Sequence, residues 1–277
     1  MNTLECCFKN KKFVFSLVVL LLILFIMLFG SMLAPNDPLE MNTRNIFAAS
    51  SLEFPLGTDE YGRCILSRLM YGVRPSLTVA LLGTLGAFAA GSLLGIIAGY
   101  TSGKIGNAIM RTVEVILCFP PILLAMMVVC LWGAGVRNLT IVVAILYTPH
   151  FTRIAYSSTL KVRKMEYVEN EISIGASPSW VLRKTIFPNV LSPLIIQISL
   201  TISSAILLES GLSFLGLGVQ PPDPSWGQMI GDARSFLSVN IMYTIWPSIF
   251  LSLTILATNL MGDALRDALD PKLKASF

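Results

Sequence analysis

Long uncharged runs alternate with short charged segments along the chain, and this alternation predicts a membrane protein. Phe13–Leu33 contains no charged residue and is long enough to cross about 30 Å of hydrocarbon at about 1.5 Å per residue. Five more runs have a similar length and few or no charges: Leu77–Tyr100, Thr112–Trp132, Leu139–Tyr156, Leu191–Leu208 and Ile241–Gly262. The pattern therefore predicts an all-α membrane protein with six transmembrane helices.

Composition supports the same class. Hydrophobic residues make up 54% of the 277 positions and charged residues only 13%, and the mean hydropathy is +0.72. Soluble domains carry about a quarter charged residues, so this chain has too little polar surface to cover itself in water. The first run could also be a signal peptide, but its apolar core exceeds the roughly 7–15 residues of a cleaved signal. We expect an uncleaved helix.

The distribution of Lys and Arg predicts the orientation. With both termini in the cytoplasm, all but six of the 20 basic residues lie on the cytoplasmic side. The six on the outer side are Arg44, Arg63, Arg68, Arg74, Arg137 and Arg234. The predicted order is a cytoplasmic N-terminus (1–12), a first helix (13–33), an extracytoplasmic segment (34–76) and a transmembrane region (77–277). The end of 34–76, ILSRLMYGVR, is either a short amphipathic helix at the interface or a plain connecting loop.

Residues 161–190, here called the charged hairpin, interrupt the apolar pattern between the fourth and fifth runs. Met165, Val168 and Ile172 recur at spacings of three and four, which places them on one face of a helix. Gly175 can end that helix in a left-handed conformation. Ser177-Pro178 then resembles the start of a second helix, which Pro188 is expected to close. The sequence predicts a cytoplasmic helix-turn-helix.

The charged hairpin also resembles the loop shared by permease subunits of bacterial ATP-binding cassette importers, whose pattern is E-A-A, three residues, Gly, then I-x-L-P. Glu169-Asn170-Glu171 stands for E-A-A, Gly175 follows six positions after Glu169, and Ile186-Phe187-Pro188 stands for the end of the pattern. Both alanines and the leucine are replaced, so the match depends on Glu169, Gly175, Ile186, Pro188 and their spacing.

Three further stretches resemble the peptide/nickel branch of these permeases. They are GTDEYGRCILSRLMYGVRPSL from Gly57, with Cys64 in place of the usual Asp, LSFLGLGVQPPDPSWGQMI from Leu212, and GDALRDALDP from Gly262. The resemblance covers nearly all of the chain from Leu56 to Lys272. It implies the type I importer transmembrane-domain fold, a location in the cell membrane, and a cytoplasmic coupling loop at 157–190.

The resemblance also implies a complex and a set of coupling residues. Such a permease works with a sibling permease, two ATP-binding cassette ATPase subunits and an extracytoplasmic substrate-binding protein. ATP would be bound by the partner subunits, and this chain would carry no cofactor. The substrates implied are di- and oligopeptides or nickel and metal chelates. The residues expected to couple to the ATPase are Glu166, Glu169, Glu171, Gly175, Ala176, Ile186 and Pro188.

The sequence carries no motif for its own chemistry. GYTSGKI at 99–105 lacks the spacing of a phosphate-binding loop, because three residues rather than four separate its glycines and Ile follows the Lys. The five cysteines have no metal-ligand spacing, and His150 is the sole histidine. We therefore expect a transport subunit without enzymatic activity or a metal site.

Glu114 and Glu209 fall in or near the apolar runs, where a carboxylate is costly and usually faces a cavity or a partner. Either could line a translocation path. Alternatively, each could sit at the end of a span and reach the headgroups, with Arg111 neutralising Glu114 one helical turn away.

Two other classes of function compete with an importer permease. A secondary transporter or channel would show buried charge relays or inverted repeats with broken helices, and the sequence shows neither. A membrane-tethered regulator would use the charged hairpin to bind DNA, but three glutamates in its first helix oppose contact with phosphates.

Overall fold

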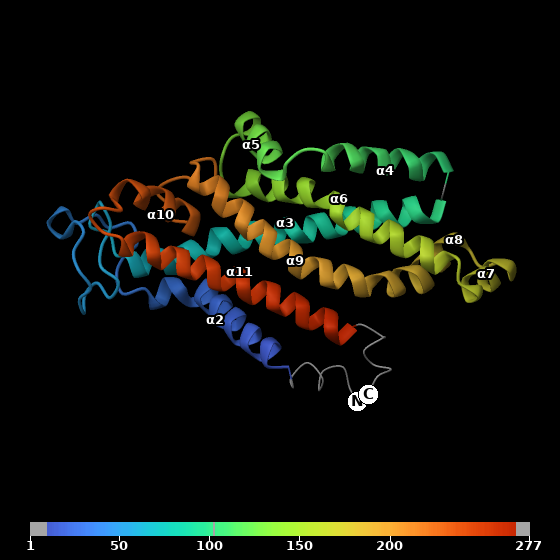
Figure 1. The fold of residues 1–277 in the computed structure, drawn as a ribbon, viewed down its shortest axis with the longest axis horizontal. Helices are drawn as coiled ribbons and strands as arrows, with labels where there is room; N and C mark the ends of the chain where they lie inside the picture. The colour runs from blue at the N-terminus through green and yellow to red at the C-terminus, as the bar shows by residue number, and fades with distance from the viewer. Residues whose placement is uncertain (1–9, 102, 270–277) are drawn as a thin grey trace.

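The computed structural model describes residues 10–101 and 103–269, which form an elongated bundle of helices (Figure 1). An isolated β-bridge joins Thr58 and Cys64. The elements in chain order are α2 (Lys11–Leu33), η1 (Thr43–Asn45), α3 (Ile65–Thr101), α4 (Gly103–Leu117), α5 (Pro121–Trp132), α6 (Val136–Arg163), α7 (Glu166–Ser173), α8 (Pro178–Trp180), η2 (Val181–Ile186), α9 (Phe187–Phe214), α10 (Trp226–Ala233), η3 (Arg234–Phe236) and α11 (Met242–Leu269). The segment η2 is a π-helix and is called the π segment below.

Within the described residues, five helical stretches are long and apolar enough to cross a membrane, and a sixth results if the bent pair α4 and α5 counts as one span. This agrees with the six predicted helices and the all-α class. The third span was expected to be one helix over 112–132, and this is wrong. The two helices meet at 91°, because Pro120 and Pro121 supply no N–H donors and the residue before a proline disfavours the helical conformation.

The second span begins twelve residues before its expected start. Residues 65–74 form neither a separate interface helix nor a loop, because they are the first turns of α3, which continues through Pro75. Leu69 and Val73 are almost fully buried in this stretch, and the indole Nε1 of Trp226 in α10 donates a hydrogen bond to the carbonyl oxygen of Leu69 at 3.1 Å. Packing against α10 therefore holds this part of the helix in place despite the proline.

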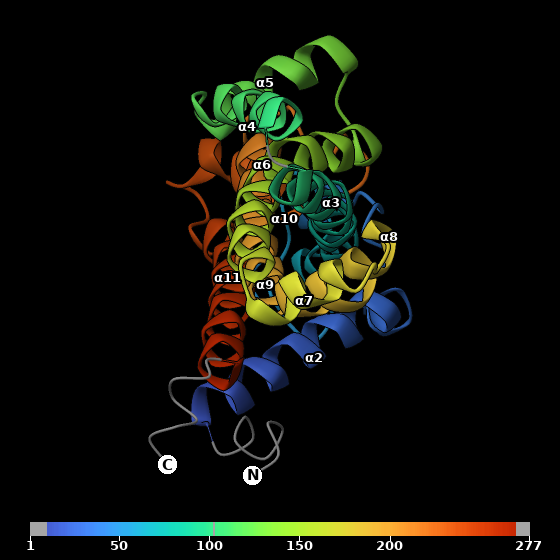
Figure 2. The same ribbon diagram turned by 90° about the vertical axis from the view of Figure 1, so that its right-hand side faces the viewer.

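The centre of the bundle is the parallel pair α3 and α6, whose contacting residues rise in number together along both helices (Figures 1 and 2). Glycines recur every four residues along the contact face of α3, at Gly91, Gly95 and Gly99. A Cβ at Gly91 would lie 2.6 Å from both the carbonyl oxygen of Thr148 and the Cβ of Phe151. The two backbones are therefore in direct contact, the close approach that small residues allow between membrane helices.

Helix α2 lies along the outside of the bundle against α3 and α11 (Figure 2). Arg74 of α3 reaches across to it and donates hydrogen bonds to the carbonyl oxygens of Met27 at 2.9 Å and Leu28 at 3.2 Å. Most of the remaining α2 surface is apolar and exposed, as expected for a helix in contact with lipid.

A buried ion-pair network stabilises the end of the bundle opposite α7. The carboxylate of Asp59 lies 2.6 Å from Nε of Arg63 and 3.5 Å from Nε of Arg68, and all three side chains are almost fully buried. Asp59 also accepts hydrogen bonds from the backbone N–H groups of Tyr61 and Arg63. The block from Gly57 to Arg68 thus has a structural role in tying the irregular segment 34–64 to the start of α3.

Candidate functional site

The charged hairpin projects from one end of the bundle, where it follows the end of α6 and its first complete helix is α7 (Figure 1). Gly175 follows α7 with φ +90°, a value that glycine adopts without steric cost. The N–H of Gly175 bonds the carbonyl of Ile172 at 3.1 Å, and the N–H of Ala176 bonds the carbonyl of Glu171 at 3.0 Å. These two bonds form a Schellman motif, so the predicted glycine C-cap is confirmed.

The second half of the hairpin differs from the prediction. Ser177 is extended and Pro178 is the first residue of α8, as expected, but Pro188 does not close the helix. The helical run continues from Pro178 to Phe214 through the π segment. Pro188 lies at the second residue of α9, where the hydrogen-bond register changes from i+5 to i+4 and a missing N–H is tolerated.

The apolar residues of α7 divide between two environments. Val168 is fully buried, in the same apolar cluster as Val181 and Ile186. Met165 and Ile172, predicted on the same face, are 48% and 45% exposed. Val168 thus anchors α7 to the bundle, whereas the rest of the chain leaves the side chains of Met165 and Ile172 uncovered.

A hollow of about 340 Å³ lies on the outer surface of the Gly175 turn. It is lined by Glu171, Ile174, Gly175, Ala176, Ser177 and Trp180. Ile174 is 84% exposed and Trp180 is 48% exposed. Three of the predicted coupling residues therefore line one apolar depression at the tip of the hairpin.

The three glutamates among the predicted coupling residues differ in their exposure and in their hydrogen-bond partners. Glu166 and Glu169 are exposed in the first turn of α7, where negative charge is favourable at a helix N-terminus. Glu171 lines the hollow and is only partly exposed, and its carboxylate oxygens accept from Oγ1 of Thr185 at 2.7 and 3.0 Å. Pro188 is exposed two residues after the buried Ile186. The structure thus places Glu166 and Glu169 on the surface and Glu171 within the hairpin.

The two intramembrane acids also have different surroundings. Glu114 is 58% exposed and pairs with Arg111 at 3.2 Å, which agrees with the expected neutralisation by Arg111. Glu209 has no exposed surface, and its carboxylate accepts from the hydroxyl of Ser213 at 2.7 Å and that of Ser210 at 3.4 Å. The interpretation that Glu209 reaches the headgroups is therefore wrong. Its position on a translocation path stays a prediction, and in this conformation the chain's own packing separates it from any such path.

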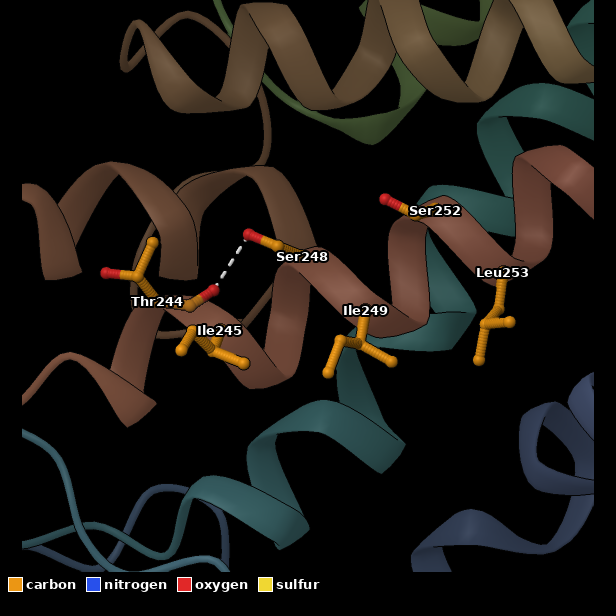
Figure 3. A pocket seen from close by; sticks show the side chains of 6 residues that line it. All are labelled: Thr244, Ile245, Ser248, Ile249, Ser252 and Leu253. Carbon is orange, nitrogen blue, oxygen red and sulfur yellow. Dashed lines mark hydrogen bonds between the residues drawn. The ribbon is translucent and has the colours of Figure 1, made fainter.

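The sequence reasoning did not identify a row of hydroxyl residues on α11. Thr244, Ser248 and Ser252 are spaced by four residues and line a hollow of about 370 Å³ together with three aliphatic residues, as Figure 3 shows. Ser248 donates its hydroxyl to the carbonyl of Thr244 at 2.8 Å, whereas Ser252 is exposed. The signal was present as hydroxyl residues at helical spacing within the last apolar run.

The part of the chain that the structure describes contains no group of three or more His, Cys, Asp or Glu side chains placed to hold a metal ion. His150 is partly buried beside Tyr147, with ring centroids 5.6 Å apart. The basic residues Lys9, Lys272 and Lys274, which contributed to the predicted orientation, lie outside the described residues.

Comparison with known families gives two matches. The family described as binding-protein-dependent transport system inner membrane component matches residues 91–275. A second family, the N-terminal transmembrane domain of oligopeptide transport permease C, matches residues 7–50.

Curated relatives match along most of the chain. A di/tripeptide transport system permease of Pseudomonas aeruginosa is 39% identical over 271 residues, covering 96% of this chain and 89% of the relative. The dipeptide permease of Escherichia coli K12 is 41% identical over 272 residues, covering 96% and 91%. A glutathione transport permease of Pectobacterium atrosepticum is 42% identical over 220 residues, covering 79% and 73%.

Among solved structures, a chain of the inward-facing methionine transporter MetNI superposes with a TM-score of 0.61 at 18% sequence identity. The match covers 73% of this chain and 96% of that chain. It supports the type I importer transmembrane fold.

Proposed function

The chain belongs to the binding-protein-dependent transport system inner membrane components, and from this premise we propose that it imports peptides and receives its driving force through the charged hairpin. It is a membrane-embedded permease subunit of an ATP-binding cassette importer, a transport component rather than an enzyme. The substrate, the partner subunits and the coupling residues make up the proposal.

The observation that carries the coupling proposal is the set of exposed apolar side chains at the tip of the hairpin. Ile174, Trp180, Met165 and Ile172 are each between 45% and 84% exposed, on a segment predicted to lie in the aqueous cytoplasm. Burial of one such side chain contributes about 1.5–3 kcal/mol. A protein surface that covers the hairpin would therefore gain several kcal/mol, and the hollow beside Gly175 offers it a shaped seat.

We propose that an ATPase subunit fills this role, with Glu166 and Glu169 at the edge of the contact. The chain has no phosphate-binding loop of its own, so ATP would be bound by two such partners. A sibling permease would complete the substrate path, and an extracytoplasmic binding protein would deliver the substrate. The hydroxyl row on α11 supports a path on that side, because Ser252 is an exposed polar group within a span.

Peptides are favoured over nickel as the substrate by the relatives, whose names specify di- and tripeptides, dipeptides and glutathione. Fully buried Glu209 is not in a position to select the charge of a substrate in this conformation. Selection would then depend mainly on the binding protein and on the complete path formed by both permeases.

Replacement of Ile174 by Asp tests the docking of the ATPase. The carboxylate would have to be desolvated in the proposed contact, so we expect at least a tenfold loss of ATPase co-purification and of dipeptide uptake at an unchanged membrane level. Ile46→Asp is the matched control, because Ile46 is a 45% exposed isoleucine in the segment 34–64. Normal co-purification and uptake with Ile174→Asp would refute the assignment of the hairpin.

A further inference from the structure

Glu171 lines the hollow at the Gly175 turn, and the side-chain hydrogen bonds of its carboxylate are made within the hairpin. Both carboxylate oxygens accept from the single hydroxyl of Thr185, fourteen residues later in the chain, at 2.7 and 3.0 Å. Thr185 is only 7% exposed. A hydrogen bond to a carboxylate oxygen is among the stronger ones in proteins.

Glu171 also holds the turn that follows α7. Its backbone carbonyl accepts the N–H of Ala176 in the Schellman motif. One residue therefore fixes the Gly175 turn through its main chain and the π segment through its side chain. In the E-A-A pattern this position is an alanine. An alanine could fix the Gly175 turn through its backbone carbonyl, but it has no side-chain acceptor for the hydroxyl of Thr185.

The partner of Glu171 lies where α7 meets the long membrane helix. Thr185 is in the π segment, which leads directly into α9, and its carbonyl accepts the side-chain amide of Asn189 at 2.7 Å. The buried side chains of Val168 in α7 and of Val181 and Ile186 in the π segment flank the same junction. Apolar contacts of this kind resist separation but permit sliding, whereas a hydrogen bond fixes direction.

We propose that Glu171 and Thr185 form a clasp that makes α7 and the start of α9 move as one body. The clasp rests on the proposed function, because it transmits a displacement of α7 only if an ATPase subunit drives that helix. Glu171 and Thr185 are then positioning residues. Without the clasp, α7 still docks but pivots at the Gly175 turn, so ATP is hydrolysed without a matching movement of α9.

The test uses the complete transporter, with its sibling permease, ATPase subunits and binding protein, reconstituted in proteoliposomes. The quantity measured is the number of ATP molecules hydrolysed per dipeptide imported. Thr185→Val removes the donor at nearly constant volume, and we expect it to raise this ratio about tenfold, as loss of one charge-assisted hydrogen bond allows. The rate of hydrolysis itself should stay within about twofold of the parent, because docking of α7 is retained.

Thr185→Ser is the matched control, because it retains the hydroxyl and should keep the parental ratio. Glu171→Ala should raise the ratio as Thr185→Val does, and the double variant should be no worse than either single one, because all three remove the same bond. A parental ratio in Thr185→Val, or additive effects in the double variant, would overturn the clasp. Loss of ATPase binding in Thr185→Val would also overturn it, since the hydroxyl would then serve docking.

The Ile174→Asp variant separates this proposal from the one on which it rests. If Ile174→Asp releases the ATPase while Thr185→Val keeps the parental ratio, the hairpin docks the ATPase and the clasp is wrong. If Ile174→Asp keeps the ATPase bound and uptake normal, the proposed function itself fails, whatever the result for Thr185→Val.

Discussion

Substitution of Gly175 separates the conformation of the turn from its size. The residue has φ +90°, and no heavy atom lies within 4 Å of the place where a Cβ would be. A larger side chain therefore meets no neighbour, and the cost of any substitution is the cost of the backbone conformation. That cost is about 1–2 kcal/mol for an ordinary L-residue and up to about 3 kcal/mol for a β-branched one, whereas Asn tolerates left-handed geometry.

We expect the loss of dipeptide uptake to be smallest for Gly175→Asn, larger for Gly175→Ala and largest for Gly175→Val. With Gly175→Val, 2–3 kcal/mol of strain would shift the turn by a factor of about 30 to 150 toward other conformations. The Schellman bonds from Gly175 and Ala176 would break, and α7 would leave its position beside the π segment. Gly175→Asn should retain most of the uptake, although its side chain is about as large as that of Val.

The assay compares uptake, membrane level and ATPase co-purification for the three variants. Insertion should be equal in all of them, because the turn lies outside the membrane spans. Normal uptake and ATPase binding with Gly175→Val would refute the role of the turn. Equal losses with Asn and Val would show that the side chain obstructs a partner, and the argument from φ would be wrong.

Two further predictions concern stability in detergent. Gly91→Ala should lower the thermal unfolding temperature and cost a few kcal/mol of stability, because its Cβ would meet the backbone of α6 at 2.6 Å. The control is Gly211→Ala, whose Cβ would lie 3.7 Å from its nearest neighbour, and it should be neutral or slightly stabilising. Equal unfolding temperatures for the two variants would contradict the close α3–α6 contact. Burial raises the pKa of Asp232 above its ordinary value of 3.8, against the opposing attraction of Arg68 and Arg63. The folded state therefore holds the proton more tightly than the unfolded state, and stability falls as the pH rises from 3.8 through the raised pKa. Asp232→Asn should be more stable than the parent at neutral pH, and its advantage in stability should shrink in acid. An advantage that grows in acid would contradict this reasoning.

The apolar runs identified the spans because the bilayer requires them, whereas interior prolines misled the placement of helix ends. The second span was expected to begin at Leu77, but α3 begins at Ile65 and continues through Pro75, and Trp226 of α10 bonds the carbonyl of Leu69 in the part before the proline. Pro188 was taken as the end of a helix and lies near the start of one. In both cases tertiary packing or a register change, neither of which is local in sequence, decides the outcome.

The candidate site was predictable in position but not in the direction of its side chains. The spacing of Glu169, Gly175 and Ile186 located the hairpin, and Gly175 adopts the expected conformation. Helical periodicity placed Met165, Val168 and Ile172 on one face, but only Val168 is buried, because α7 makes few contacts with α6 and the π segment. The partner of Glu171 lies fourteen residues away within the π segment, which no local pattern indicates.

The glycines along α3 limit how this permease can change shape. Where side chains separate two helices, rotamer changes allow one helix to slide or roll over the other. Between α3 and α6 the glycines bring the backbones into contact at Gly91 and its neighbours, so no side chain of α3 separates the helices there. These two helices should keep a fixed spacing throughout the transport cycle, and a pair of distance probes placed on them would report a constant value while probes on α9 and α11 change.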